Sequence, residues 1–334
     1  MMEIMSFGNQ IRSGEYKIHS TFRSAINFIS GDKFVFVVNE RIGPGPVNIV
    51  INGIVPESID SLKVEESCLK FNNVEYGFES GRSYNSAIGI SEYNHEVFVR
   101  NLRIVEETVF EKAPAKSLAF LVSDIWGQFG NTTIPLTSFA KGEFEELPLS
   151  PNRDCEENIG AFELECRRKI RMGAAQILFG ELISGVKMIK GLGPGLTPSG
   201  DDFNSGLLIA MNVVERIEEM TSEHGIPAFA GMKGESAGMT DEILRFAQND
   251  KETTRGILES VYEAARGKNL FTNAFLECAA NGNVFYKFRE LIRALQFTNV
   301  KEIINNTELV MTMGETSGAD QLTGFLIGMK RFLK

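Results

Sequence analysis

The stretch GLGPGLTPSGDDF, residues 191–203, determines how the second half of this 334-residue chain is organised. Its first half holds three glycines and a proline, a composition that excludes regular structure there. Thr197 then has the chemistry of a helix N-cap, and Pro198 suits the first helical position, where no amide proton is needed. Asp201 and Asp202 follow in the first turn, where negative charge is favoured. The stretch therefore predicts a glycine-rich loop that leads into a helix, and such a helix start offers free backbone amides to an anion.

A second copy of this helix start occurs near the end of the chain. Residues 317–329, SGADQLTGFLIGM, align without gaps on residues 199–211, SGDDFNSGLLIAM. The shared pattern is Ser-Gly-x-Asp-x-x-x-Gly-x-Leu-Ile-x-Met. Two such helix starts in one chain suggest a pair that faces one site.

The glycine-rich loop has two interpretations. In the first, its backbone amides and hydroxyls bind a phosphate or a carboxylate, and the loop is one half of the paired site. In the second, it is only a helix–helix connection whose aspartates complement the helix dipole, an effect of about 0.3–1 kcal/mol each. The repeat favours the first. The candidate ligand-binding residues are Gly193, Gly195, Thr197, Ser199, Gly200, Ser317 and Gly318. The loop is not a P-loop, because the Gly-Lys-Ser/Thr end is absent.

Three carboxylates beside the expected anion site need an explanation, because they would repel an anion. Asp201 and Asp202 lie in the first copy of the motif and Asp320 in the second. A Mg²⁺ ion that bridges the carboxylates to a phosphate would remove the conflict, since Mg²⁺ binds through one or two carboxylates plus substrate oxygens. Alternatively, the aspartates accept hydrogen bonds from loop amides and hold the turn.

Further polar residues are weaker candidates for ligand contacts. His19 has a side chain suited to proton transfer near neutral pH, although a single histidine is more often structural. Asn48, after a Gly-Pro-Gly-Pro loop, could present its amide to a ligand, or it could simply be a turn residue. Lys187 and Lys190 precede the glycine-rich loop and could neutralise an anion. The sequence shows no catalytic Ser/His/Asp or Cys/His triad.

Composition narrows the classes of partner. The formal net charge of −10 and the absence of a long Lys/Arg run argue against nucleic acid as a partner. The longest apolar run, at residues 207–214, is too short to span a membrane. The N-terminus lacks the pattern of a signal peptide. The four cysteines have no zinc-type spacing, and we expect reduced thiols in a cytoplasmic protein.

The first part of the chain has the pattern of β-strands. Runs at residues 34–38 and 47–51 predict buried strands, and a hairpin is expected to turn at Asn72-Asn73. Residues 97–110 and 117–122 look like further strands. We therefore expect an α+β protein whose N-terminal domain, residues 1–150, is a mostly antiparallel barrel or sandwich-like structure.

The second part, residues 151–334, has helical periodicity and is expected to form an all-α domain that carries both glycine-rich motifs. Helices are predicted at residues 155–182, 257–265, 271–280, 284–297 and 300–313, in addition to those that follow the two motifs. Residues 223–250 do not fit, since Ala-Gly-Met recurs there and the stretch resembles a translated repetitive DNA element. We interpret it as a surface insertion, which costs little because loop-closure entropy grows slowly with length.

Several motifs together resemble one family, that of the AllH subunit of bacterial oxamate carbamoyltransferase, described earlier as a domain of unknown function or as a carboxylase. They are His19-Ser20-x-Phe22 with Asn27, Gly43-Pro44-Gly45-Pro46 with Asn48, the loop at residues 193–202, Thr272-Asn273 with Ala279-Ala280-x-Gly282, and Ser317-Gly318-x-Asp320. The block Gly-Leu-Thr-Pro-Ser-Gly-Asp-Asp is the most specific of these.

The resemblance implies a subunit of a multi-protein enzyme of anaerobic allantoin breakdown. That enzyme interconverts oxalurate plus phosphate with oxamate plus carbamoyl phosphate, and one of its other subunits is similar to succinyl-CoA synthetase. These ligands are all small anions, which is compatible with the helix-start interpretation. The alternative function, from a different class, is a non-catalytic subunit that senses a ligand or organises the complex.

Overall fold

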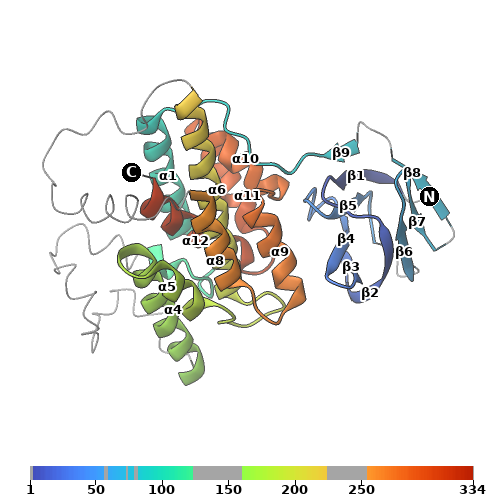
Figure 1. Ribbon diagram of the computed structural model, residues 1–334, viewed down its shortest axis with the longest axis horizontal. Coiled ribbons are helices and arrows are strands. Elements are labelled where there is room, and N and C mark those ends of the chain that lie inside the picture. Colours follow the sequence, from blue (N-terminus) through green and yellow to red (C-terminus); the bar gives the residue numbers. More distant parts are fainter. Residues whose placement is uncertain are drawn as a thin grey trace, which may run out of the picture.

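The protein has an N-terminal sheet followed by a helical region, as a computed structural model shows (Figure 1). The structure describes residues 3–55, 59–72, 74–78, 82–122, 160–223 and 254–333. The sheet lies at one end of the molecule and the helices at the other, with α9 (Leu270–Ala280) on the side that faces the sheet. The predicted α+β class, with β-rich and helical parts in this order, is confirmed.

Nine strands of the described residues form one curled sheet in the order β8-β7-β6-β2-β3-β4-β5-β1-β9. The strands are β1 (Ile4–Gly8), β2 (Gly14–Phe22), β3 (Ala25–Ser30), β4 (Lys33–Asn39), β5 (Asn48–Ile51), β6 (Ser61–Val64), β7 (Cys68–Phe71), β8 (Val74–Gly77) and β9 (Ser83–Tyr84). Neighbours are antiparallel except for the parallel pairs β4–β5 and β1–β9. The predicted hairpin is β7–β8, and Asn72 adopts a φ of 52° at its turn.

The two faces of the sheet bury different sets of side chains, because successive residues of a strand point to opposite sides. One face of β3 and β4 holds Phe28, Val35 and Val37 in a core of its own. On the other face, Phe36 stacks on Phe275 of α9 with ring centroids 5.4 Å apart, and it also contacts Phe271. This aromatic contact joins the sheet to the helical region.

The described helices are α1 (His95–Lys112), α4 (Ala161–Phe179), α5 (Leu182–Ile189), α6 (Ser199–Glu223), α8 (Thr254–Ala265), α9, α10 (Tyr286–Leu295), α11 (Val300–Met311) and α12 (Ser317–Phe332). The predicted helices of the second half are confirmed within the described residues, with shifts of a few residues at their ends. The start of the range 155–182 lies outside the described residues, and α5 was not predicted. None of the described helices is long and apolar enough to cross a membrane.

The prediction of strands at residues 97–110 and 117–122 is wrong. The first stretch is α1, capped by the side chain of Asn94, and it buries Phe98, Leu102 and Val109 at helical spacing. In the second stretch, Leu121 and Val122 donate to carbonyls three residues earlier, as in a helical turn. The valine-rich composition suggested strands, but the apolar residues repeat with the helical period.

The proposed division into domains stays a prediction. Its expected boundary at residues 148–151 lies outside the described residues, and so does the expected insertion apart from Glu223, the last residue of α6. α1 precedes that boundary, yet its buried side chains belong to the same core as those of α6 and α12.

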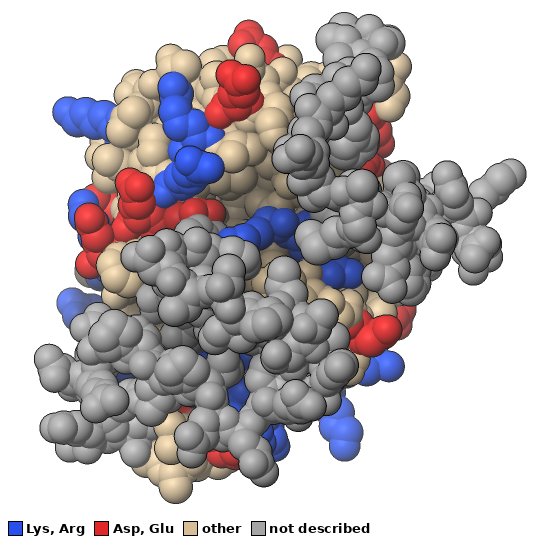
Figure 2. Space-filling model, turned by 90° about the vertical axis from the view of Figure 1, so that its left-hand side faces the viewer, with Lys and Arg blue, Asp and Glu red and all other residues tan. Residues whose placement is uncertain are grey.

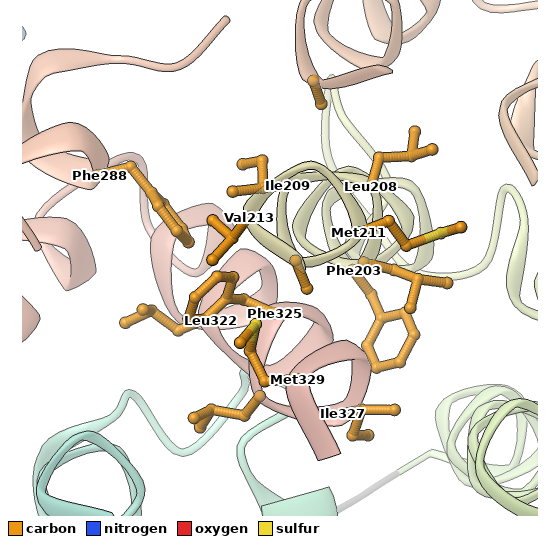
Figure 3. Close-up of a cluster of buried hydrophobic side chains, with 14 of the residues drawn as sticks. Phe203, Leu208, Ile209, Met211, Val213, Phe288, Leu322, Phe325, Ile327 and Met329 are labelled. Carbon is orange, nitrogen blue, oxygen red and sulfur yellow. The ribbon is translucent and has the colours of Figure 1, made fainter. Parts of the chain in front are cut away.

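Helices α6 and α12, which begin with the two copies of the repeated motif, form the centre of the helical core (Figure 3). Phe325 of α12 meets Phe288 of α10 with ring centroids 5.3 Å apart. A Cβ added to Gly206 would overlap the carbonyl oxygen of Gln321, and one added to Gly324 would overlap that of Phe203. Phe203 and Gln321 occupy equivalent positions in the two copies, so the helices cross with approximate two-fold symmetry.

Candidate functional site

The glycine-rich loop between α5 and α6 is shaped by backbone conformations that side chains disfavour. Gly191, Gly193 and Gly195 have φ values of 72°, 104° and 106°, in the left-handed region that glycine adopts readily. The amide of Gly200 donates to the carbonyl of Leu192 at 2.8 Å and closes the loop over the helix start. Local sequence therefore determines this turn.

The structure brings the two helix starts together. The hydroxyl of Thr197, at the start of α6, lies 3.4 Å from the hydroxyl of Ser317, the first residue of α12. Thr197 also donates to Oδ2 of Asp202 at 3.0 Å. Thr197 and Ser317 are half-buried, whereas Ser199 is buried behind them.

The carboxyl groups of the two motifs accept hydrogen bonds from backbone amides of their surroundings. Asp201 Oδ1 accepts from the amide of Gly191 at 2.7 Å, and Asp320 Oδ1 accepts from the amide of Leu118 at 2.6 Å. These bonds agree with the alternative in which the aspartates hold the turns. In the described part of the chain, no group of three or more His, Cys, Asp or Glu residues could hold a metal ion. Asp201, Asp202 and Asp320 are described residues, so the Mg²⁺ site predicted from them has no support from this arrangement and stays a prediction.

Burial changes the charge of the two equivalent acids. Loss of solvent raises the pKa of Asp202 to about 8, and the neighbouring carboxyls of Asp320 and Asp201 add to the rise, against the hydroxyls of Ser317 and Thr197. Burial likewise raises the pKa of Asp320 to about 6, opposed by the amide of Leu118. Asp202 is therefore mostly protonated at pH 7 and does not repel an anion. This explanation depends on burial and was not among the sequence-based alternatives.

Three consecutive amides of the loop are free. The N–H groups of Gly195, Leu196 and Thr197 have no hydrogen-bond acceptor within the described residues. Gly195 and Leu196 are exposed, so an approaching ligand can reach their amides. Successive unpaired amides in a turn attract anions.

Two of the predicted ligand-binding glycines instead lie in packed positions. The amide of Gly318 donates to the carbonyl of Met313 at 2.9 Å, as that of Gly200 does to Leu192. A Cβ at Gly200 would overlap the carbonyl oxygen of Ile189, and a Cβ at Gly318 would overlap that of Val310. These packing contacts alone explain why both copies need glycine at this position, and ligand binding is not required as an explanation.

His19 and Asn48 lie on strands β2 and β5 of the sheet. His19 is exposed on β2, and its ring stacks near Phe271 of α9 with centroids 6.2 Å apart. The amide of Asn48, 1% exposed, donates to the carbonyl of Gly43 at 2.9 Å, and its Oδ1 has no partner among the described residues. Neither side chain hydrogen-bonds to the glycine-rich loop in the described structure.

Sequence reasoning missed the basic loop between α8 and α9. Asn269, the N-cap of α9, donates from its amide to the carbonyl of Leu196 at 2.9 Å. Lys190 donates to the carbonyl of Arg266 at 2.8 Å. The signal in the sequence was the pair of basic residues Arg266 and Lys268, a few positions before Thr272-Asn273.

The comparisons with known proteins agree with the motif-based resemblance. The family described as oxamate carbamoyltransferase subunit AllH matches residues 189–251 and 235–329. Residues 189–329 are therefore similar to the AllH family. No curated protein and no solved structure gives a significant match.

The AllH match covers the centre of the helical region. It begins at the last residue of α5, includes the glycine-rich loop with α6, and ends within α12. Both copies of the repeated motif lie inside it. The sheet, which carries His19 and Asn48, lies outside it.

The surface of the molecule carries charges of both signs. On the face shown in Figure 2, basic and acidic side chains of the described residues lie side by side. The net charge of −10 argues against a broad basic face of the kind that binds a polyanion. A small anion would instead need local donors such as the loop amides.

Proposed function

We propose that the chain is a subunit of an oxamate carbamoyltransferase-like enzyme and that it binds a small anion at the paired helix starts. The ligand is oxalurate, oxamate, carbamoyl phosphate or phosphate. The observation that carries the proposal is the set of free amides at Gly195, Leu196 and Thr197 beside the hydroxyl of Ser317, in the region that matches the AllH family.

The chemistry of the site favours negative charge. Successive free amides of a fixed turn stabilise an oxyanion or a phosphate without reorganisation, and the hydroxyls of Thr197 and Ser317 can add to them when they turn from Asp202 to the ligand. Asp202, held neutral by burial, does not oppose that charge near pH 7. The loop is exposed at Gly195, which leaves room for a ligand or for a partner subunit.

The family description implies partner subunits, and we infer that turnover requires them. A subunit similar to succinyl-CoA synthetase is the partner that the family resemblance indicates. The cytoplasmic location expected from the N-terminus and the cysteines stays a prediction. Mg²⁺ remains a candidate cofactor through Asp201, Asp202 and Asp320.

The alternative is a non-catalytic subunit that senses the anion or organises the complex. It is favoured by the position of His19 on the sheet, where its ring contacts Phe34 and Phe271 and not the loop. The loop itself offers amides, hydroxyls and carboxyls, which can bind and orient a ligand.

Binding is tested by calorimetry of the full chain with carbamoyl phosphate and with oxamate. Thr197→Val and Ser317→Ala remove one hydroxyl each, and we expect affinity to fall about three- to tenfold for each. Ser222→Ala, at the other end of α6, is the matched control and should bind as the wild type does. Wild-type affinity in both loop variants would show that the paired starts are structural only.

Catalysis is tested in the reconstituted complex, by the formation of carbamoyl phosphate from oxalurate and phosphate. Thr197→Val should lower turnover while the complex assembles normally. If turnover is unchanged whenever the complex assembles, the non-catalytic alternative is correct.

A further inference from the structure

A cavity of about 540 Å³ lies on the side of the glycine-rich loop that faces α8 and α9. Gly191, Pro198 and Asp201 line it from the loop, and residues 266–269 line it from the α8–α9 connection. Two hydrogen bonds tie these walls together: Asn269 to the carbonyl of Leu196, and Lys190 to the carbonyl of Arg266. Its volume is within the range of roughly 300–1,000 Å³ of small-molecule sites.

The lining of the cavity is basic although the whole chain is acidic. Lys190, Arg266 and Lys268 face it, and Asp201 is its one acidic lining residue in the described structure. Asp201 already accepts the amide of Gly191. Arg266 pairs with Glu263 at 3.3 Å, whereas Lys190 and Lys268 form no ion pair within the described residues.

One residue of the cavity wall carries a covered hydroxyl that lacks a partner. Thr272, in the first turn of α9, lines the cavity and is 4% exposed. Its Oγ1 has no hydrogen-bond partner among the described residues. The backbone amides of Phe271 and Thr272 are used by the side chain of Asn269, so the helix start itself is satisfied. A buried hydroxyl without a partner is uncommon and marks a place where a ligand can supply one.

We propose that this cavity is a second anion site, which binds a small molecule through a phosphate or carboxylate group. Lys268 and Lys190 supply the positive charge, and the hydroxyl of Thr272, which is covered in this structure, donates to the anion once its side chain rotates toward the cavity. The site is separate from the free amides of Gly195 to Thr197, which lie further along the loop. It does not depend on the function proposed above, because its own residues define it.

The test is calorimetry of the full chain with inorganic phosphate. Lys268→Ala and Thr272→Val should each weaken phosphate binding about tenfold, since each removes one donor to a charged group. Thr272→Ser keeps the hydroxyl and should retain most of the affinity. Lys301→Ala, an exposed lysine of α11, is the matched control and should bind as the wild type does.

Two results overturn the proposal: wild-type protein that does not bind phosphate at millimolar concentration, or wild-type phosphate affinity in both Lys268→Ala and Thr272→Val. Thr197→Val, measured in parallel, separates the two sites. If it alone weakens phosphate binding, the anion sits at the loop amides, the cavity assignment is wrong and the function proposed above stands. Lys268 is exposed, so its variant tests the site even if Thr272→Val fails to fold.

Discussion

The two copies of the Ser-Gly-x-Asp motif start α6 and α12 with equivalent packing contacts, but the loops before them differ. Gly206 of the first copy packs on Gln321 of the second, and Gly324 of the second packs on Phe203 of the first. The two contacts are therefore equivalent. Upstream, the first copy has the long glycine-rich turn with free amides, whereas the second follows a short turn at Gly314. The repeat therefore accounts for how the helices pack, and the preceding loop accounts for the candidate site.

The equivalent aspartates of the two copies, Asp202 and Asp320, also differ in their surroundings. Asp202 receives hydroxyl donors, from Thr197 and Ser317, and its pKa is raised to about 8. Hydroxyls, those of Ser199 and Thr316, also lower the pKa of Asp320, but Asp320 in addition receives the backbone amide of Leu118, which stabilises its charged form, and burial raises its pKa only to about 6. Identical residues in a repeated motif thus differ in charge near pH 7, because different neighbours reach them.

The largest expected effect comes from breaking the shared packing. Gly206→Ala and Gly324→Ala each place a Cβ on a backbone oxygen of the facing helix, and the helices must separate. We expect each to lower the free energy of unfolding by about 3 kcal/mol or more, as for a severely overpacked core. Urea denaturation measures this, with Gly89→Ala, at an open position, as the control. A large loss in one variant and none in the other would disprove the two-fold equivalence.

The next effect concerns the pH dependence of stability. Asp202 keeps its proton in the folded state up to about pH 8, while the unfolded chain releases it near the ordinary pKa of 3.8. The contribution of Asp202 to the free energy of unfolding is therefore fully present below pH 3.8. It is lost as the pH rises from there toward 8, with a slope of up to about 1.4 kcal/mol per pH unit. Asp202→Asn, which is always neutral, should flatten this slope.

Asp320→Asn sharpens the comparison between the copies. Because the folded-state pKa of Asp320 is about 6, its variant should change the slope mainly below pH 6. Between pH 6 and pH 8 the change should be smaller than in Asp202→Asn, and it arises because the Asp320 carboxyl adds to the raised pKa of Asp202. Denaturation curves at several pH values decide this. Equal effects of Asp202→Asn and Asp320→Asn between pH 6 and pH 8 would contradict the different protonation of the two acids.

The smallest effect tests the loop that only the first copy has. Asp201, which is Ala319 in the second copy, holds the amide of Gly191. Asp201→Ala makes the first copy resemble the second and should cost about 1 kcal/mol, the usual net value of one hydrogen bond. Amide exchange at Gly191 should become faster while exchange within α12 is unchanged. Unchanged exchange at Gly191 would show that this bond does not hold the loop.

Much of the fold could be predicted because its signals are local. Strands β4 and β5, the β7–β8 hairpin and the helices from α4 onward, except α5, followed from periodicity and turn residues. α1 was missed because valine and phenylalanine favour strands in isolation, whereas packing on the helical core selected the helical face with Phe98 and Val109. The basic α8–α9 loop was missed because Lys190 and Lys268 are distant in sequence and meet only at the cavity.

The sequence by itself determined the glycine-rich turn, the two helix starts and their repetition, because backbone conformation and capping depend on residues a few positions apart. Only the tertiary structure decided that Thr197 lies beside Ser317, that Asp202 is buried deeply enough to hold its proton, and which amides remain free. Those properties depend on where water is excluded and on which groups, distant in sequence, come within hydrogen-bond distance. The packing of α6 against α12 determines both.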